Sequence, residues 1–238
     1  MFGLKIKTLT ALMLATALIG PGIKPGYDPD QFVLPEEAEV LVVVEGNEDR
    51  TCLVTAYEKS DGSWKSVFAV NGNTGQNGMS KNRVEGDMTT PVGVWLMNTP
   101  FGQKPAQEGF PSNYLNVTDR SYVWTKDSND LVYDPEGRLD GERIGSDYYS
   151  VCYDYVINSG YNANKVSNKG SAIFIHCQGM QAGTSAGCIK IPEENMIELM
   201  KLYGKHGDGK CFIAVGITGE IDKLYDKYGT NNGLEAQY

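Results

Sequence analysis

The sequence predicts a mainly β fold with one helix, and three observations support this expectation. Glycine and tyrosine are frequent, with 28 and 14 copies among 238 residues. Short runs rich in β-branched and aromatic residues alternate with Gly, Asn, Asp and Ser, which is typical of strands joined by turns. Only one long segment, close to the C-terminal end, has apolar residues at helical spacing.

The expected strands follow one another through the chain as short apolar or alternating runs. Ser60 to Ser63 joins two of them as a hairpin turn. The run 149–157 alternates between apolar and polar residues, and 171–176 is an apolar run that ends on a histidine. In chain order we expect strands at 39–44, 51–58, 64–71, 94–97, 121–125, 149–157, 171–176 and 211–217.

The expected helix covers residues 192–203. Pro192 suits the first helical position, Glu193 and Glu194 suit the positive N-terminal end, and Gly204 is the expected C-terminal cap. One apolar face is formed by Met196, Leu199, Met200 and Tyr203.

The chain divides into four parts. Residues 1–20 have two lysines followed by an uncharged apolar run and Gly-Pro-Gly, which predicts a signal peptide or a short N-terminal membrane anchor. Residues 21–38 hold four of the ten prolines and predict a linker. Residues 39–218 form the expected catalytic body, and 219–238 form a polar C-terminal tail. We therefore expect an exported protein of the cell envelope.

Charge and cysteine content exclude several functions. The net charge of −9 repels phosphate backbones and argues against nucleic-acid binding. The five cysteines have no CxxC spacing and the chain has two histidines, so no metal site and no cofactor are expected. An exported chain can pair cysteines, yet an odd number leaves at least one thiol free in a monomer.

His176 and Cys188 are the candidate catalytic residues. His176 ends a predicted strand, and Cys188 follows twelve residues later in Ser185-Ala186-Gly187-Cys188. A glycine before the cysteine permits a sharp turn that exposes the sulfur and directs amides to one point. We expect the imidazole to take the thiol proton, and the amides of Gly187 and Cys188 to form an oxyanion hole.

The alternative is that both are ordinary core residues. His206 lies in a polar Gly-rich turn, where a solvated role is expected. Cys177 is a rival nucleophile, but it follows His176 directly on a strand, so its side chain points to the opposite face. We expect Cys177 to be a core or disulfide cysteine.

Three ordered segments resemble the L,D-transpeptidase catalytic domain, the YkuD-type family. They are Glu85–Gly93 (EGDMTTPVG), Gly160–Asn162 with the lead-in Gly170–His176 (GSAIFIH), and Ser185–Lys190 (SAGCIK). Ala186 stands where the commonest form has a second histidine, so the match is to a Ser/Thr-Ala-Gly-Cys branch of the family.

The resemblance implies a β-sandwich or barrel and a function in building the cell wall. Such enzymes attack the bond after the third residue of a peptidoglycan tetrapeptide stem and release D-Ala. A second stem's amine resolves the thioester as a 3→3 cross-link, whereas water gives L,D-carboxypeptidase activity. Carried over by position, Cys188 is the nucleophile, His176 the base and Gly187 part of the oxyanion turn; Ser185, Lys190, Tyr161 and Asn162 are candidate substrate-binding residues.

Other functions fit less well. A sortase needs an arginine beyond the cysteine, but all five arginines precede Cys188. Papain-like peptidases have the cysteine before the histidine, which is the reverse of the order here. A non-catalytic wall-binding module of the same fold remains as the alternative to an enzyme.

Overall fold

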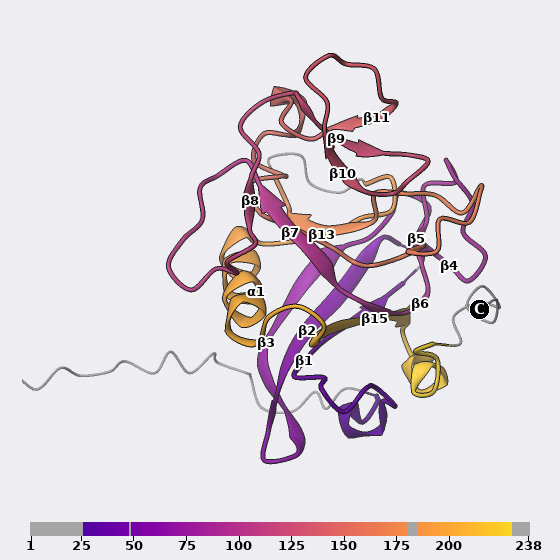
Figure 1. The fold of residues 1–238 in the computed structure, drawn as a ribbon. Coiled ribbons are helices and arrows are strands. Elements are labelled where there is room, and N and C mark those ends of the chain that lie inside the picture. The colour runs from indigo at the N-terminus through magenta and orange to yellow at the C-terminus, as the bar shows by residue number, and fades with distance from the viewer. Residues whose placement is uncertain (1–25, 48, 180–184, 230–238) are drawn as a thin grey trace, which may run out of the picture.

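The computed structural model describes residues 26–47, 49–179 and 185–229, and they form a curled sheet with one α-helix (Figure 1). Ten strands make the main sheet in the order β6-β15-β1-β2-β3-β14-β13-β12-β7-β8. Their bounds are β1 (Val40–Gly46), β2 (Thr51–Ser60), β3 (Ser63–Asn73), β6 (Gly93–Leu96), β7 (Asn98–Gly102), β8 (Leu115–Asn116), β12 (Val156–Asn158), β13 (Phe174–Cys177), β14 (Ile189–Ile191) and β15 (Cys211–Ile217). The mainly β prediction is confirmed.

Two smaller sheets complete the strands of the described residues. One pairs β4 (Met79–Ser80) with β5 (Thr90–Pro91), and the other joins β9 (Tyr122–Thr125), β10 (Leu131–Tyr133) and β11 (Gly141–Arg143). We call residues 117–155 the cap; it contains β9 to β11 and a short 3-10 helix, η2 (Asp147–Tyr149). Figure 1 shows the cap at the opposite end of the molecule from the strands of β1 and β2.

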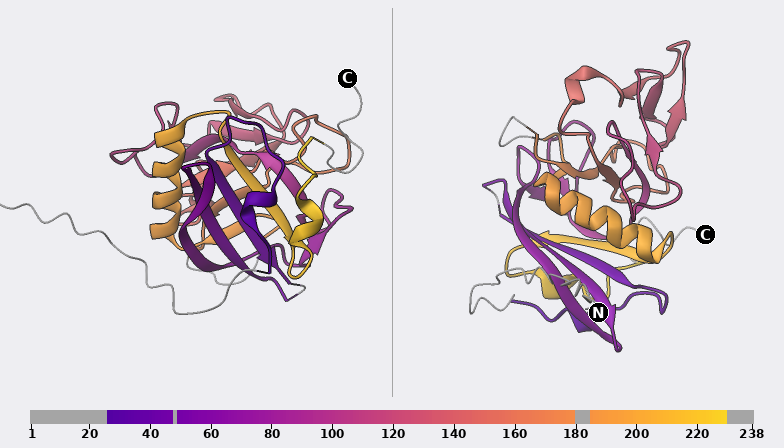
Figure 2. Two further views of the ribbon diagram at one scale, coloured as in Figure 1. Left: turned by 90° about the horizontal axis from the view of Figure 1, so that it is seen from below. Right: turned by 90° about the vertical axis from the view of Figure 1, so that its left-hand side faces the viewer.

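The helix α1 (Glu193–His206) covers one face of the main sheet (Figure 2). Its buried residues pack on the alternate side chains of β1, β13 and β15 that face it, and this layer is the largest apolar core. The helix continues past Gly204, which the sequence predicted as its cap, and ends at His206, with Gly207 as its C-cap at a φ of 83°. A Cβ on Gly204 would lie 2.2 Å from the Gly109 carbonyl, so this glycine allows a close approach between the helix and a loop.

Residues 26–38 are not a linker in the structure. Tyr27, Phe32 and Ala38 are buried in a second apolar cluster on the outer face of β1 and β15. A short 3-10 helix, η1 (Pro29–Gln31), lies in this segment, and the Tyr27 hydroxyl is 2.9 Å from that of Tyr57. Of the prolines that suggested a linker, Pro29 begins η1, and the Pro35 carbonyl accepts from the Ala38 N–H at 3.0 Å in a turn.

The polar tail predicted from residue 219 also begins inside the folded body. Ile221 and Leu224, in the 3-10 helix η3 (Ile221–Leu224), are buried in the same second cluster. The described part of the domain therefore reaches beyond residue 218. No helix of the described residues is long and apolar enough to cross a membrane.

Of the strand predicted at 149–157, only the last two residues are in a strand, β12, which continues to Asn158. Residues 147–149 are η2, and Val151 has a φ of 71°, a conformation that β-branched residues rarely adopt. Tyr149 and Tyr153 instead face the apolar cluster between the cap and the sheet, whereas Tyr155 lies in the core under α1.

Phe32→Ala should destabilise the protein by about 2–4 kcal/mol, because Phe32 is 7% exposed and fills the second cluster. Val33→Ala is the matched control, since Val33 is 66% exposed and its truncation should change stability by less than about 0.5 kcal/mol. Equilibrium urea unfolding measures both. Equal, small effects of the two substitutions would mean that 26–38 is a linker after all.

Candidate active site

His176 and Cys188 lie on the same face of two neighbouring parallel strands. The register pairs Ile175 with Ile189 and His176 with Lys190. Because side chains alternate along a strand, Phe174, His176, Cys188 and Lys190 share one face of the sheet. Ile175 and Ile189 point the other way, into the core under α1.

Cys177 follows this alternation and is confirmed as a core cysteine. Its side chain lies in the cluster under α1, and its Sγ is 3.7 Å from the carbonyl of Tyr155. All five cysteines are free thiols in the structure, so Cys177 is not a disulfide partner here.

The turn before Cys188 is held by hydrogen bonds from a segment a hundred residues earlier. The Thr90 hydroxyl donates to the Gly187 carbonyl at 2.8 Å and accepts from the Gly75 N–H. The Ser185 carbonyl accepts from the Gln76 N–H at 2.9 Å. The sequence identified residues 85–93 only by their resemblance to the family. In the structure one of them, Thr90, anchors the turn before Cys188 directly.

Arg83 contacts the candidate site, and the sequence did not identify it. Its side chain is 5% exposed, and Nη1 donates to the Ala186 carbonyl at 3.2 Å, to the Thr89 carbonyl and to Asp87. Its position two residues before the EGD segment was the available signal. A buried guanidinium that bonds the backbone next to Cys188 fixes the turn and adds a positive charge near the thiol.

Both the backbone conformation and the limited space at position 187 require a glycine. Its φ is 137°, and a Cβ there would lie 2.6 Å from Arg83 Nη1 and 2.6 Å from the Thr89 carbonyl. In this conformation its N–H donates to the Ser185 hydroxyl at 3.2 Å, and that hydroxyl donates to the Cys188 carbonyl. The Gly187 amide is thus already engaged, so an oxyanion role requires this bond to be exchanged.

The Cys188 thiol lies in an apolar cluster under the cap. Cys188 is 6% exposed and packs with Phe174, Tyr153 and Trp124. Its Sγ is 3.4 Å from the Phe174 N–H and 3.3 Å from the Ala172 carbonyl. The structure therefore shows the Cys188 thiol closed off from solvent.

His176 is oriented by a main-chain carbonyl. Its Nδ1 lies 2.8 Å from the Cys177 carbonyl oxygen, and its ring packs edge-on against Tyr153 at 5.1 Å between centroids. A carbonyl only accepts hydrogen bonds, so Nδ1 carries the hydrogen of the neutral ring and Nε2 keeps its lone pair. No hydrogen bond joins the side chains of His176 and Cys188, both of which are described.

Burial keeps both groups neutral in this closed arrangement. It raises the pKa of the Cys188 thiol to about 12, an effect that Glu142 strengthens and that the Phe174 N–H and Arg83 oppose. Burial also lowers the pKa of His176 to about 4, against hydrogen bonds to the backbone of Cys177 and Cys152. The ion pair expected from sequence is therefore not the resting state of the closed site.

Lys190 and Ser185 lie at the site, as predicted by position. Lys190 is 4% exposed and stands opposite His176 in the strand register. Burial lowers its pKa, while Cys152 and Cys188 act in the opposite direction. Ser185 braces the turn through its hydroxyl. Substrate contact by either residue stays a prediction.

Tyr161 and Asn162 have structural contacts among the described residues. The Tyr161 ring packs on Trp95, and its hydroxyl donates to the Lys169 carbonyl at 2.8 Å. The Asn162 amide donates to the carbonyls of Val166 and Gly170. The pair shapes the loop that leads into β13, and no described hydrogen bond connects it to Cys188 or His176.

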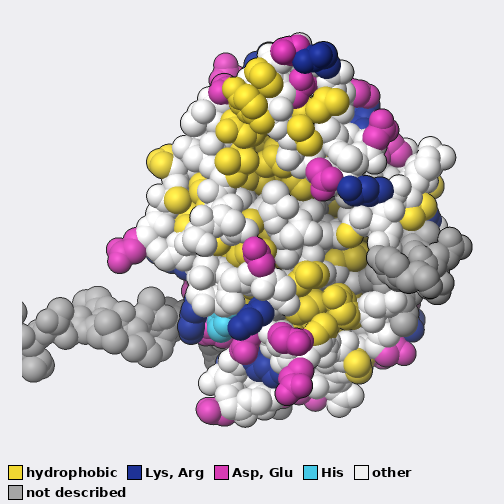
Figure 3. Space-filling model, in the orientation of Figure 1, with side chains coloured by type: hydrophobic (Ala, Val, Ile, Leu, Met, Phe, Trp, Pro, Cys, Tyr) yellow, Lys and Arg dark blue, Asp and Glu magenta, His cyan; other side chains and the backbone are white. Residues whose placement is uncertain are grey.

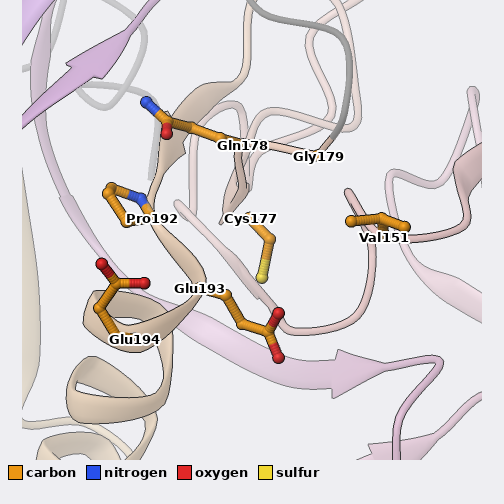
Figure 4. A pocket seen from close by; sticks show the side chains of 7 residues that line it. All are labelled: Val151, Cys177, Gln178, Gly179, Pro192, Glu193 and Glu194. Carbon is orange, nitrogen blue, oxygen red and sulfur yellow. The ribbon is translucent and has the colours of Figure 1, made fainter.

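An open cavity of about 280 Å³ lies at the end of β13 beside the start of α1 (Figure 4). Its walls are Val151, Cys177, Gln178, Gly179, Pro192, Glu193 and Glu194. Neither His176 nor Cys188 lines it, so it is a hollow next to the candidate site rather than the reaction centre. Figure 3 shows hydrophobic side chains gathered over the cap, where Tyr133, Leu139 and Tyr148 are exposed.

A mainly β domain with a histidine and a cysteine on one sheet face agrees with the resemblance to the L,D-transpeptidase catalytic domain that the sequence indicated. The model of the L,D-transpeptidase catalytic domain (YkuD) matches residues 39–208, and the chain belongs to this family. Among solved structures, Bd1075 of Bdellovibrio bacteriovorus aligns with 12% identity and a TM-score of 0.43, over 84% of this chain and 58% of that one. The chain thus spans less than two thirds of that structure. The comparison with curated proteins gave no match.

Gly187→Ala should cost roughly 2–4 kcal/mol of stability, because the new methyl group meets Arg83 and the Thr89 carbonyl at an unfavourable φ. Gly62→Ala is the control: its φ is similarly positive at 79°, but nothing lies within 4 Å, so we expect about 1 kcal/mol. Urea unfolding compares the two. A loss at Gly187 no larger than at Gly62 contradicts the tight packing of the turn.

The alkylation rate of Cys188 should keep rising from pH 7 to pH 10. Its thiol pKa is raised to about 12, so the thiolate fraction still grows where a free thiol of pKa about 8.5 has levelled off. Iodoacetamide labelling with peptide mapping measures this, and the same protein in urea is the control. A plateau near pH 8 in the folded protein would show that the thiol is not buried as described.

Proposed function

We propose that this chain is an L,D-transpeptidase that forms 3→3 cross-links in peptidoglycan through a thioester on Cys188. One observation carries the proposal: in a domain of this family, the parallel register of β13 and β14 puts His176 and Cys188 on one sheet face. The substrates are peptidoglycan stem peptides, and the protein acts outside the cytoplasm. The leader or membrane anchor predicted at 1–20 lies outside the described residues.

Together, His176 and Cys188 can carry out an acyl transfer in two steps. His176 Nε2 takes the thiol proton, and the sulfur attacks the carbonyl carbon of the third stem residue. The bond to the terminal D-Ala breaks, its amine leaves with the proton from the imidazolium, and the acyl group stays on sulfur. An amine of a second stem then attacks the thioester, loses a proton to the imidazole and frees the thiol.

The burial of Cys188 bears on the two alternatives to a transpeptidase, an L,D-carboxypeptidase and a non-catalytic wall-binding module. If water replaces the second amine, the same thioester gives L,D-carboxypeptidase activity. The burial of Cys188 and its raised thiol pKa favour the non-catalytic wall-binding module, because a module needs no accessible thiolate. The proposal therefore requires that a stem peptide displaces the cap.

Incubating the protein with a disaccharide-tetrapeptide and analysing the products by mass spectrometry tests the proposal. A cross-linked dimer with released D-Ala supports the transpeptidase, and tripeptide alone indicates the carboxypeptidase. Absence of both products from the folded protein indicates the module and removes the proposed activity.

Cys188→Ala should slow D-Ala release by roughly a thousandfold or more, because it removes the proposed acyl carrier. His176→Ala should slow it by about 10² to 10⁴, the usual contribution of a general base. Cys177→Ala is the matched control, since its side chain lies in the core under α1, and it should keep its activity. Loss of activity in Cys177→Ala with retention in Cys188→Ala would reverse the assignment.

A further inference from the structure

Glu142 is a carboxylate that the cap directs toward the candidate site. It lies on β11 directly across from Trp124 of β9, so the two side chains share one face of the small sheet. Trp124 packs on Phe174 at 4.8 Å between centroids, in the cluster that contains Cys188. Glu142 therefore faces the same apolar cluster from the cap side.

One tyrosine connects this carboxylate to the imidazole. The Tyr153 hydroxyl donates to Glu142 Oε2 at 3.1 Å, and the Tyr153 ring packs on His176 and on Phe174. Glu142 is consequently separated from His176 by a single side chain. It is also the charged group with the largest influence on the Cys188 thiol, whose pKa it raises.

Glu142 has no cationic partner among the described residues, unlike its neighbours. Asp134 of the cap pairs with Arg143 at 2.8 Å, and Asp154 pairs with Lys104 at 3.0 Å. Burial raises the pKa of Glu142 to about 7, against the hydrogen bond from Tyr153. A half-buried carboxylate without a counter-ion is costly to ionise, and a cation that enters the site stabilises the ionised form.

We propose that Glu142 binds the side-chain ammonium of the third residue of the acyl donor. This inference rests on the proposed function, because that residue supplies the carbonyl attacked by Cys188, and the family resemblance implies that it is a diamino acid. A free amine on its side chain is a cation tethered close to the scissile bond. Glu142 then selects donors with that amine free over donors in which it is blocked.

Binding to the Cys188→Ala protein tests this selection without turnover. The probes are a tetrapeptide stem with a free side-chain amine on its third residue and the same stem with that amine acetylated. Calorimetry should show roughly tenfold tighter binding of the free amine. Glu142→Gln should remove this preference by weakening only the free-amine peptide, while Glu142→Asp, which keeps the charge, should retain part of it.

Glu136→Gln is the matched control, because Glu136 is an exposed carboxylate of the same cap that already pairs with Arg138, and it should leave the preference intact. Equal weakening of both peptides by Glu142→Gln would assign Glu142 to positioning through Tyr153 and overturn the proposal. A preference that survives Glu142→Gln, or no preference in the parent, also overturns it. D-Ala release by the unaltered protein is scored separately, so a failure of the proposed function is distinguished from a failure of this inference.

Discussion

The parallel pairing of β13 with β14 is the constraint on which the candidate site depends. Parallel neighbours require a crossover connection, and here the chain leaves β13 at Cys177 and returns at Ile189. A shift of one residue in this register would turn either His176 or Cys188 into the core under α1. The bonds from Thr90, Arg83 and Gln76 to the returning turn are therefore what hold the sulfur on the correct face.

Much of the fold was predictable because its strands follow simple patterns. The run 211–217 is β15 with the predicted bounds, and Ser60 to Ser63 joins β2 and β3 as expected. Predictions that depended on local composition alone were wrong where distant packing decides. The Pro-rich segment 26–38 packs over the sheet through Tyr27 and Phe32, because the outer face of β1 and β15 is apolar and must be covered.

The residues of the candidate site likewise fall into those that the sequence predicts and those that it does not. A strand that ends on His176 and a Gly-Cys turn are local patterns, so the sequence identifies them. Arg83 reaches the turn before Cys188, and Glu142 reaches the apolar cluster that contains Cys188, only through tertiary structure, one from before β5 and the other from the cap. Glu142 has no local pattern that distinguishes it from a surface charge, and the one signal for Arg83 was its position two residues before the EGD segment, so the sequence identified neither.

The burial of Cys188 also bears on which acceptor the proposed thioester meets. The thiol is covered by Tyr153 and its neighbours, so the proposed thioester forms only after a donor peptide has displaced that cover. A displaced cap admits bulk water as well as the amine of an acceptor stem. The Cys177 carbonyl keeps the hydrogen on Nδ1 and so leaves Nε2 as the site that accepts the acceptor's proton. On the proposed function, the extent to which the cap closes again over the thioester would therefore decide between an amine and water as the acceptor.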